Sequence, residues 1–394
     1  MTEWKETTLA DLCIDISYGY TESAKQEKIG PKFLRITDIA SGRIEWTDVP
    51  YCTINEADFD KYKLLPGDIV IARTGATTGA NYTIKENDPN YLVFASYLIR
   101  YIIDRSKADP FYIGQLLRSP NWNEYIDAIA SGSAQPGANA KQLGSFEVNL
   151  PPLREQRAIA SVLSSLDDKI DLLHRQNKTL EEMAETLFRQ WFVEEADEGW
   201  EVGKLGDEFD FTMGTSPSGS SFNEEGIGTP MYQGNRDFGF RFPDNRVSTT
   251  EPKRFAEKYD TLISVRAPVG EQNMANEKCC IGRGVAAFRY KPKSDYYTYT
   301  YFKMKLLMDE IKQFNETGTV FGSISKNDFQ EIEIIIPPSN LVERFQKEVK
   351  PIDDKIIINC NQNRTLIALR DTLLPKLMSG NIRVSLDDLK EEIV

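Results

Sequence analysis

Two stretches of this chain place apolar side chains at alternating steps of four and three residues. The first begins at Leu153 and keeps this pattern to about Phe192. A mean period of about 3.5 residues is typical of a helix that packs along a second helix in a coiled coil. About 40 residues at a rise of 1.5 Å per residue predict a helix of ~60 Å. The members of this first seam are Ile159, Leu163, Leu166, Ile170, Leu173, Asn177, Leu180, Ala184, Leu187 and Trp191.

The second stretch repeats the first at a fixed offset, from 167 to 353. The tetrapeptide DDKI occurs at 167–170 and again at 353–356, and the proline pair at 151–152 recurs at 337–338. A shared offset over a long stretch indicates an internal repeat. We therefore expect two similar long helices that belong to one packed pair. The second seam is more polar and consists of Phe345, Val349, Ile352, Ile356, Asn359, Asn363, Leu366, Arg370, Leu373 and Leu377.

The repeat also predicts how individual residues of the two helices lie. The isoleucine of each DDKI should lie in the seam, and the Asp-Asp-Lys before it should lie on the outer face. Asn177 and Asn363 share one heptad position, and if the helices pack antiparallel about a pseudo-two-fold axis, we expect their amides to approach each other near that axis. Pro375 should kink or end the second helix, and Gly380 offers a C-terminal stop.

The regions before the two helices have a different pattern, in which short apolar runs alternate with turns. KLLPGDIVIARTGATTG predicts a strand entered through a Pro-Gly turn and left through a Gly/Thr-rich loop. EKYDTLISVRAPVG repeats this pattern, with Asp260 for Asp68 and Arg266 for Arg73. Each region is therefore expected to be an α+β domain of mixed strands and helices. The predicted division is a first domain at 1–152, a helix at 153–195, a second domain at 196–338, a helix at 339–380 and a tail at 381–394.

Composition restricts the chemistry that this chain could perform. With 394 residues, 40% of them hydrophobic, it can bury the cores of two or more domains. Its five cysteines match no C-x-x-C spacing, so neither a zinc site nor a disulfide framework is predicted. The single histidine, His174, is expected to be an exposed helix residue beside the seam. No apolar run could span a membrane and the first residues do not form a signal peptide, which favours a cytoplasmic protein.

The motifs of stand-alone enzymes are missing from the sequence. No G-x-x-x-x-G-K-[ST] motif is present, so no P-loop nucleotide site is predicted. NLPPL and IPPSN do not fit an adenine methyltransferase tetrad, and IGRG is more typical of a turn than of a phosphate cradle. The Asp167-Asp168 pair is expected to face solvent and not to act in acid-base catalysis. The sequence therefore favours a binding protein without a catalytic or metal site.

Charge is distributed unevenly along the chain. A formal net charge of −13 would oppose binding to nucleic acid if it were spread evenly. Residues 230–293, however, contain seven Arg and five Lys against seven acidic residues, and MYQGNRDFGFRFPDNR interleaves arginines with aromatic residues. Smaller basic windows lie at 25–43 and 61–85. An acidic chain with local basic surfaces is compatible with a DNA partner.

A long ordered string of motifs resembles a known family. LPPLREQRAIASVLSSLDDKIDLLHRQNKTLEEMAETLFRQWFV and the later LRDTLLPKLMSGNI are similar to the specificity (S) subunits of type I restriction-modification systems. The resemblance covers essentially the whole chain, and GDIVIARTGATTG is similar to a strand and loop of that family's target recognition domains. The second copy departs from the pattern, because PPSNLVERF lacks the Glu-Gln that usually follows the prolines.

This resemblance implies a function for the predicted architecture. In such subunits two target recognition domains each read one half of a bipartite double-stranded DNA sequence. Two antiparallel helices hold the domains apart and dock two modification (methyltransferase) subunits. The chain itself would be non-catalytic and would bind no cofactor. S-adenosylmethionine, ATP and Mg²⁺ would be brought by the modification subunits and by the restriction (translocase and endonuclease) subunits, and no membrane partner is expected.

DNA-contact residues are predicted at strand-to-loop turns, where polar side chains offer donors and acceptors to base edges and phosphates. Two alternatives to a DNA-specificity subunit remain open. A coiled-coil scaffold without a DNA role would show no salt-dependent DNA binding, and a stand-alone methyltransferase or nuclease with degenerate motifs would be active alone. The candidates in the first domain are Arg35, Arg43, Arg73, Thr74, Thr77, Thr78 and Asn81, and those in the second are Asn235, Arg236, Arg241, Arg246, Arg266, Gln272 and Asn273.

Overall fold

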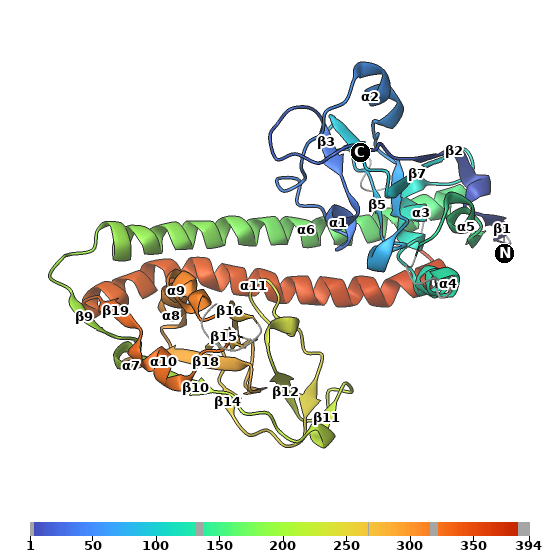
Figure 1. Ribbon diagram of the computed structural model, residues 1–394. Helices are drawn as coiled ribbons and strands as arrows, with labels where there is room; N and C mark the ends of the chain where they lie inside the picture. The colour runs from blue at the N-terminus through green and yellow to red at the C-terminus, as the bar shows by residue number, and fades with distance from the viewer. Residues whose placement is uncertain (1–3, 131–136, 267, 316–321, 385–394) are drawn as a thin grey trace, which may run out of the picture. The chain divides into compact units, whose positions relative to one another are not determined.

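Two compact units make up the chain, whose computed structural model describes residues 4–130, 137–266, 268–315 and 322–384. The first unit comprises Met1–Asp171 and Thr365–Val394, and the second comprises Leu172–Arg364. Two long helices, α6 (Leu153–Arg189) and α11 (Ser339–Met378), each contribute to both units (Figure 1). The units therefore cut across the predicted division into domains and separate helices. In the described part of the chain, no helix is long and apolar enough to cross a membrane.

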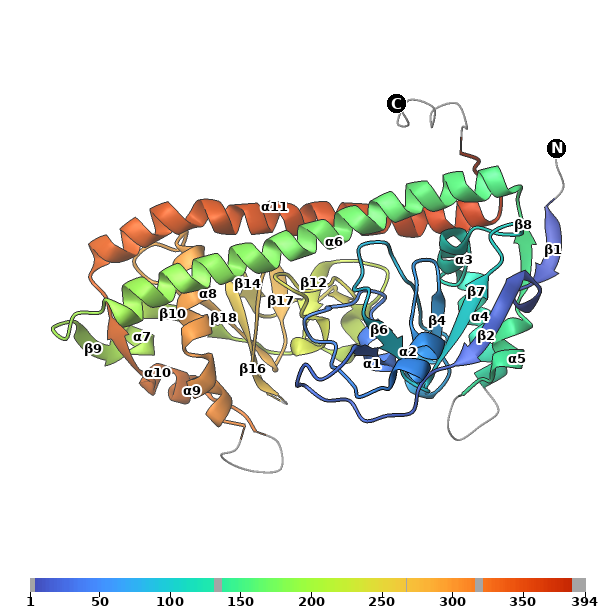
Figure 2. The same cartoon turned by 90° about the horizontal axis from the view of Figure 1, so that it is seen from above.

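The globular part of the first unit is built on an antiparallel sheet with the strand order β2-β7-β4-β5, of which Figure 2 shows β2, β7 and β4 side by side. Its strand β4 (Ile69–Ala72) is a continuous apolar run that is buried throughout. Two further strand pairs complete this part, β3 with β6 in parallel and β1 with β8 antiparallel. The other elements are β1 (Lys5–Thr8), β2 (Cys13–Tyr18), β3 (Lys32–Leu34), α1 (Ile36–Ile39), α2 (Glu56–Tyr62), β5 (Asn81–Thr83), β6 (Leu92–Phe94), β7 (Leu98–Ile103), α3 (Pro110–Leu116), α4 (Pro120–Ala130), α5 (Ala140–Gly144) and β8 (Glu147–Leu150).

The second unit repeats this plan, with the strand order β10-β18-β15-β16 in its antiparallel sheet. The strand β15 (Thr261–Val265) takes the place of β4 and is likewise buried. A second sheet, β11-β13-β12-β17-β14, lies in the same unit. The predicted α+β class and internal repeat are thus confirmed. The remaining elements are β9 (Glu201–Lys204), α7 (Leu205–Glu208), β10 (Phe209–Met213), β11 (Phe222–Asn223), β12 (Thr229–Tyr232), β13 (Ser248–Thr249), β14 (Phe255–Ala256), β16 (Val269–Met274), β17 (Cys279–Ile281), β18 (Val285–Tyr290), α8 (Tyr297–Leu306), α9 (Met308–Gln313), α10 (Lys326–Glu331) and β19 (Glu333–Ile336).

The long helices pack antiparallel, as the family resemblance implies. Leu163 near the start of α6 shares a core with Leu377 near the end of α11, and Phe188 near the end of α6 packs against Phe345, with ring centroids 5.2 Å apart. None of the central residues of the predicted heptad seam is exposed. Leu163, Leu173, Asn177, Val349 and Ile356 are buried, and Leu166, Ile170, Leu180, Ile352, Asn363 and Leu366 are partly buried.

Helix α11 passes through two prolines without ending. Pro375 was expected to kink or end it, but the helix continues to Met378. Pro351 lies in the middle of the same helix, at an exposed position. Gly380 follows with a φ of 72°, the left-handed conformation of a helix C-terminus. The C-terminal stop at this glycine is thus in place, whereas the proline is accommodated within the helix.

The first acid of each DDKI does not face solvent, contrary to the prediction. Asp167 accepts hydrogen bonds from Arg118 at 3.0 Å and from Arg370 at 3.1 Å. Its counterpart Asp353 is fully buried and lies 3.0 Å from Nη1 of Arg241. The heptad pattern describes only the face between two helices. The globular part of each unit packs against a second face of the helices. On that face Asp167 accepts a hydrogen bond from Arg118, and Asp353 forms an ion pair with Arg241.

Asn177 also has a different partner from the one that the repeat predicts. Its Oδ1 accepts a hydrogen bond from Nδ2 of Asn359 at 2.9 Å, and its own Nδ2 lies 3.3 Å from Sγ of Cys360. The predicted partner, Asn363, lies one helical turn further along α11 and is partly buried. Asn177 therefore pairs with an asparagine of the other helix, as expected, but in the observed antiparallel register this partner is Asn359 and not Asn363.

Candidate nucleic-acid interface

In the first unit, three backbone segments meet at one edge of the sheet, where β2 and β4 end and β7 begins. The backbone N–H of Arg73 donates to the Tyr97 carbonyl, and its Nε donates to the Ser96 carbonyl, both at 3.1 Å. A side chain at Gly19 would place its Cβ 2.3 Å from the Ala95 carbonyl oxygen. The turn at 95–97 is thus held between the end of β4 and the segment that follows β2.

The second unit builds the same edge from β10, β15 and β18. The backbone N–H of Val265 donates to the Gly284 carbonyl at 2.9 Å. A Cβ at Gly214 would lie 2.1 Å from the Gly282 carbonyl oxygen, and one at Gly284 would lie 2.2 Å from that of Gln233. We call these two places the strand-edge sites. They comprise residues 73–74 and 95–97 in the first unit, and 265–266 and 282–284 in the second.

The structural register between the two sites corrects one predicted equivalence. Thr74 forms a β-bridge with Gly137, and Arg266 forms the matching bridge with Ser323. Arg266 therefore corresponds to Thr74 and not to Arg73, whose counterpart is Val265. By the same register Ser96 corresponds to Arg283 and Tyr97 to Gly284. The two sites share their backbone and differ in their side chains.

The predicted contact residues of the first domain fall into two groups. Arg73, Thr74, Thr77 and Thr78 lie together in and beside the strand-edge site, and all four are partly buried. Asn81 is buried, and its Nδ2 donates to the backbone carbonyls of Gly79 and Leu117 at 3.3 and 2.5 Å. Its prediction as a DNA contact is corrected, because its amide holds the β5 region onto the helix that follows β7.

The two other arginines predicted in the first domain lie away from this edge. Arg35 begins α1 and forms an ion pair with Asp38 at 2.8 Å, which raises the pKa of the guanidinium. The side chain of Arg43 is about as exposed as that of Arg35, and it lies 3.4 Å from Glu45. The structure does not bring these two residues into the strand-edge site.

Three of the predicted residues in the second domain hold the unit together. The guanidinium of Arg241 is fully buried and lies over the ring of Tyr301, 3.7 Å from its centroid. Asn273 is fully buried and donates to the Gly239 carbonyl at 2.7 Å, and Gln272 donates to the Tyr301 carbonyl at 2.7 Å. The prediction of DNA contact is corrected for Arg241 and Asn273, since both are enclosed by protein.

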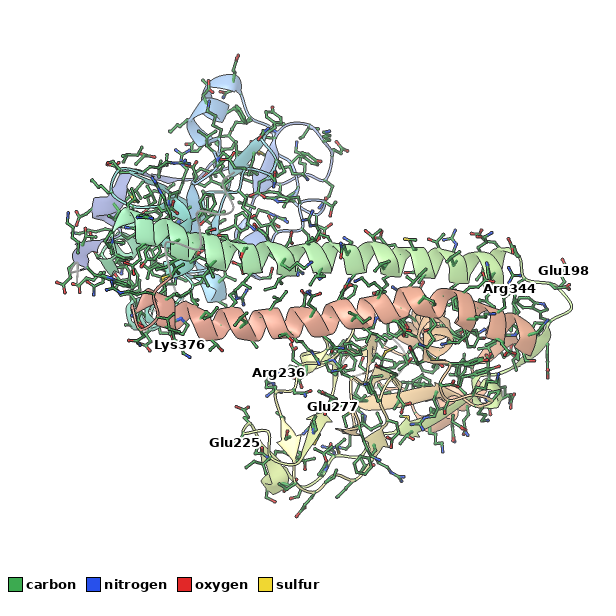
Figure 3. The ribbon with its side chains drawn as sticks, turned by 180° about the vertical axis from the view of Figure 1, so that it is seen from behind. Glu198, Glu225, Arg236, Glu277, Arg344 and Lys376 are labelled. Carbon is green, nitrogen blue, oxygen red and sulfur yellow. The ribbon has the colours of Figure 1, made fainter. Side chains whose placement is uncertain are left out.

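The remaining candidates of the second domain lie on its surface. Arg246 is half-exposed and pairs with Asp237 at 2.8 Å and Glu224 at 3.5 Å. Asn235 and Arg236 lie in the short 3-10 turn Asn235–Asp237, and Arg236 is exposed (Figure 3). Arg266 is also exposed and lies within the strand-edge site.

Arg283 is a surface arginine of the strand-edge site that the sequence interpretation missed. It is exposed at the tip of the turn between β17 and β18, and its backbone N–H donates to Oγ of Ser216 at 3.2 Å. The signal was present in the sequence as IGRG, which predicts a turn. A turn between two apolar strands places its central residue at the sheet edge, and this arginine is the central residue.

No group of three or more His, Cys, Asp and Glu side chains in the described ranges could hold a metal ion. His174 lies beside the seam on α6, where its ring packs edge-on against Phe240 at 5.3 Å. Two buried carboxyl groups precede the central strands. Burial raises the pKa of Asp68 and of Asp260, and in each case a backbone N–H three residues earlier donates to the carboxylate. These acids form the turns that lead into β4 and β15.

The sequence matches the type I restriction modification DNA specificity domain twice, over residues 1–182 and 197–366. The chain belongs to this family of type I restriction-modification specificity subunits. It is 33% identical to the putative type I restriction enzyme MjaX specificity subunit of Methanocaldococcus jannaschii, over 97% of this chain and 94% of the relative. It is 23% identical to the type I restriction enzyme HindI specificity subunit of Haemophilus influenzae, over 97% of this chain and 100% of that one.

A solved structure shares the fold of this specificity subunit. The type I restriction-modification system S subunit from M. genitalium superposes with a TM-score of 0.62 at 20% identity, covering 95% of this chain and 96% of the other. Each family match begins with a globular domain and extends into the long helix after it. The family repeat and the structural repeat therefore coincide in this specificity subunit.

Proposed function

We propose that this chain gives a type I restriction-modification complex its DNA sequence specificity, with each globular domain reading one half of a bipartite target. The observation that carries the proposal is the duplication itself. A DNA specificity domain is matched twice, and each copy presents the same sheet edge with different side chains. Two related readers with different surface groups suit a target with two different halves.

In this proposal, α6 and α11 set the distance between the two half-sites. Helices of 37 and 40 residues correspond to ~55–60 Å at 1.5 Å per residue. Two readers on one face of B-DNA require half-site centres about 34 Å, or one helical turn, apart. The helices are long enough to impose such a separation.

The catalytic groups of the complex would reside on partner subunits. We propose that the chain acts without a cofactor of its own and docks two modification subunits, which supply S-adenosylmethionine and methylate the DNA. Restriction subunits would add ATP-dependent translocation and Mg²⁺-dependent cleavage. This assignment agrees with the sequence, which contains neither a P-loop nor an adenine methyltransferase tetrad.

Adenine methylation mapping tests this function. The genomes of a host strain with and without this chain are sequenced for methylated adenine, with the cognate modification subunit present in both. A two-part motif that appears only when the chain is present is the expected result. Replacing residues 1–150 with the matching domain of a relative should change one half of that motif and leave the other half intact. Changes in both halves, or methylation by the isolated chain, would contradict the proposal.

A further inference from the structure

We propose that each domain reads its half-site through two equivalent positions of the strand-edge site, and that Arg266 and Arg283 recognise guanine in the half-site of the second domain. The positions are Thr74 and Ser96 in the first domain and Arg266 and Arg283 in the second, and Tyr97 adds an exposed ring beside the first pair. This inference rests on the proposed function and specifies which residues carry it.

The backbone of the second strand-edge site joins chain segments that carry arginines from distant parts of the sequence. Gly284 packs its Cα against the backbone of Gln233 and Gly234, and its carbonyl accepts from the N–H of Val265. Arg283 directly precedes this glycine, Arg266 directly follows Val265, and Arg236 lies two residues after Gly234. All three side chains are exposed. One glycine thus fixes the backbones that carry three surface guanidinium groups.

These arginines differ from their neighbours in having no acidic partner within the described part of the chain. Arg246 pairs with Asp237, and Arg289 forms a hydrogen-bonded ion pair with Asp260 at 2.5 Å. In a chain with a net charge of −13, the guanidinium groups of Arg266 and Arg283 on paired backbone segments form a local positive site. Guanidinium groups donate two parallel hydrogen bonds to O6 and N7 of guanine, the most frequent specific contact in the major groove.

The first strand-edge site carries different chemistry on the same backbone. Thr74 and Ser96 offer hydroxyl groups, and Tyr97 is 56% exposed. The guanidinium of Arg73 is held by the Ser96 carbonyl and by the ring of Tyr18, which it faces at 5.2 Å. Hydroxyl groups and aromatic rings contact adenine and thymine edges as readily as guanine. We therefore expect the second half-site to contain guanine, whereas the side chains of the first site do not require a guanine in the first half-site.

The backbone contacts explain why such positions suit specificity. Residues on each turn are held by backbone hydrogen bonds on both sides, and the two domains share this backbone geometry although the side chains at 96 and 283 differ. Substitutions there can alter the donor and acceptor pattern without disturbing the core. A rigid support with exchangeable side chains is what a reader of base edges requires.

The test uses the full chain assembled with its modification subunit, on the motif that the wild-type complex methylates. Arg283→Ala and Arg266→Ala are measured beside Lys293→Ala. This control removes the same charge from an exposed position beyond the far end of β18. Each complex is assayed on a set of duplexes in which every base of both half-sites is varied in turn. Arg283→Lys is included because it keeps the charge and loses the planar pair of donors.

We expect Arg283→Ala to lower methylation of the parental site at least about tenfold and to relax the preference for one guanine in the second half-site. The first half-site and the thermal midpoint should stay unchanged, and Lys293→Ala should retain the parental preference. Equal losses on every sequence, with the preference at that guanine intact, would overturn base reading by Arg283. A second half-site without guanine would overturn the inference as a whole. A wild-type complex that methylates no bipartite motif would instead refute the proposed function.

Discussion

At the scale of single residues, the second unit contains a buried cluster of charged side chains. Arg241 has no exposed side-chain surface and lies between Asp353 of α11, at 3.0 Å, and Glu181 of α6, at 3.4 Å. Thr298 donates to Asp353 at 2.9 Å. Buried charges of this kind are costly to desolvate, and losing one partner leaves the others uncompensated. The cluster fixes the second globular domain to both helices.

Arg241→Met should therefore lower the free energy of unfolding by about 3–5 kcal/mol, because it leaves Asp353 buried without its cation. The matched control is Arg246→Met, which removes a half-exposed arginine and should cost less than about 1 kcal/mol. Chemical denaturation of both variants measures the difference. Equal decreases in the free energy of unfolding would show that burial of Arg241 does not increase its contribution to stability.

The loss in Arg241→Met should also depend on pH. Burial raises the pKa of Asp353, and Arg241 opposes that rise. A carboxyl group whose pKa is higher in the folded state keeps its proton at pH values where the unfolded chain has lost it, so stability falls as pH rises above the unfolded value of about 4. Without Arg241 the pKa rises further. The variant should therefore be more destabilised relative to wild type at pH 8 than at pH 5, and a constant difference would contradict this account.

The amide pair in the helix seam gives a second prediction for single residues. Asn177→Leu alone should cost about 1–3 kcal/mol, because the amide of the fully buried Asn359 loses its acceptor. The double variant Asn177→Leu with Asn359→Leu should recover most of this loss, since both polar partners are then replaced. A double-mutant cycle on the thermal unfolding curves measures the coupling. Additive single losses would indicate that the two amides do not depend on each other.

At the scale of elements, α11 is a less regular helix than its length implies. Its seam contains polar members, and Pro351 lies in the helix interior, where it removes one backbone hydrogen bond and crowds the preceding turn. The helix persists because both units supply packing along it. Tertiary contacts thus override the local preference of the sequence.

Pro351→Ala should stabilise this helix by up to about 3 kcal/mol, since the exposed position can accept alanine and the missing backbone bond can form. Pro338→Ala serves as control, because Pro338 precedes the helix and its carbonyl already accepts from Leu341 and Val342. We expect the control to change the thermal midpoint little. A decrease in stability for Pro351→Ala would show that the proline is required where it stands.

At the scale of the whole molecule, the two long helices should act as a ruler for the DNA target. Inserting one heptad after Leu173, with a second heptad after Asn363 to keep the seam paired, adds ~10.5 Å of helix. This length equals ~3 base pairs at 3.4 Å each. The assembled variant should methylate the same two half-sites with a longer gap, on substrates whose spacer is varied one base pair at a time. An active variant that prefers the parental spacer would show that the helices do not set the distance.

The sequence alone determined the architecture of this specificity subunit. Hydrophobic periodicity predicted both long helices, the offset of DDKI predicted the repeat, and the string of motifs predicted the family. Such patterns survive in a linear sequence because a helix seam and a repeat relate residues at fixed spacing. The position of Arg73, Thr74 and Arg266 directly after a buried strand was also predicted in this way, since a strand followed by a turn is a local signal.

Only the tertiary structure decided which polar residues are available to a partner. Arg241 and Arg283 are both arginines of the basic region, yet one is enclosed by two helices and the other lies at the tip of a turn. The partner of Asn177 and the environment of Asp353 depend on the antiparallel register and on a globular domain packed across the helices. Sequence spacing cannot specify these contacts, because they join residues far apart in the chain whose proximity is set by packing.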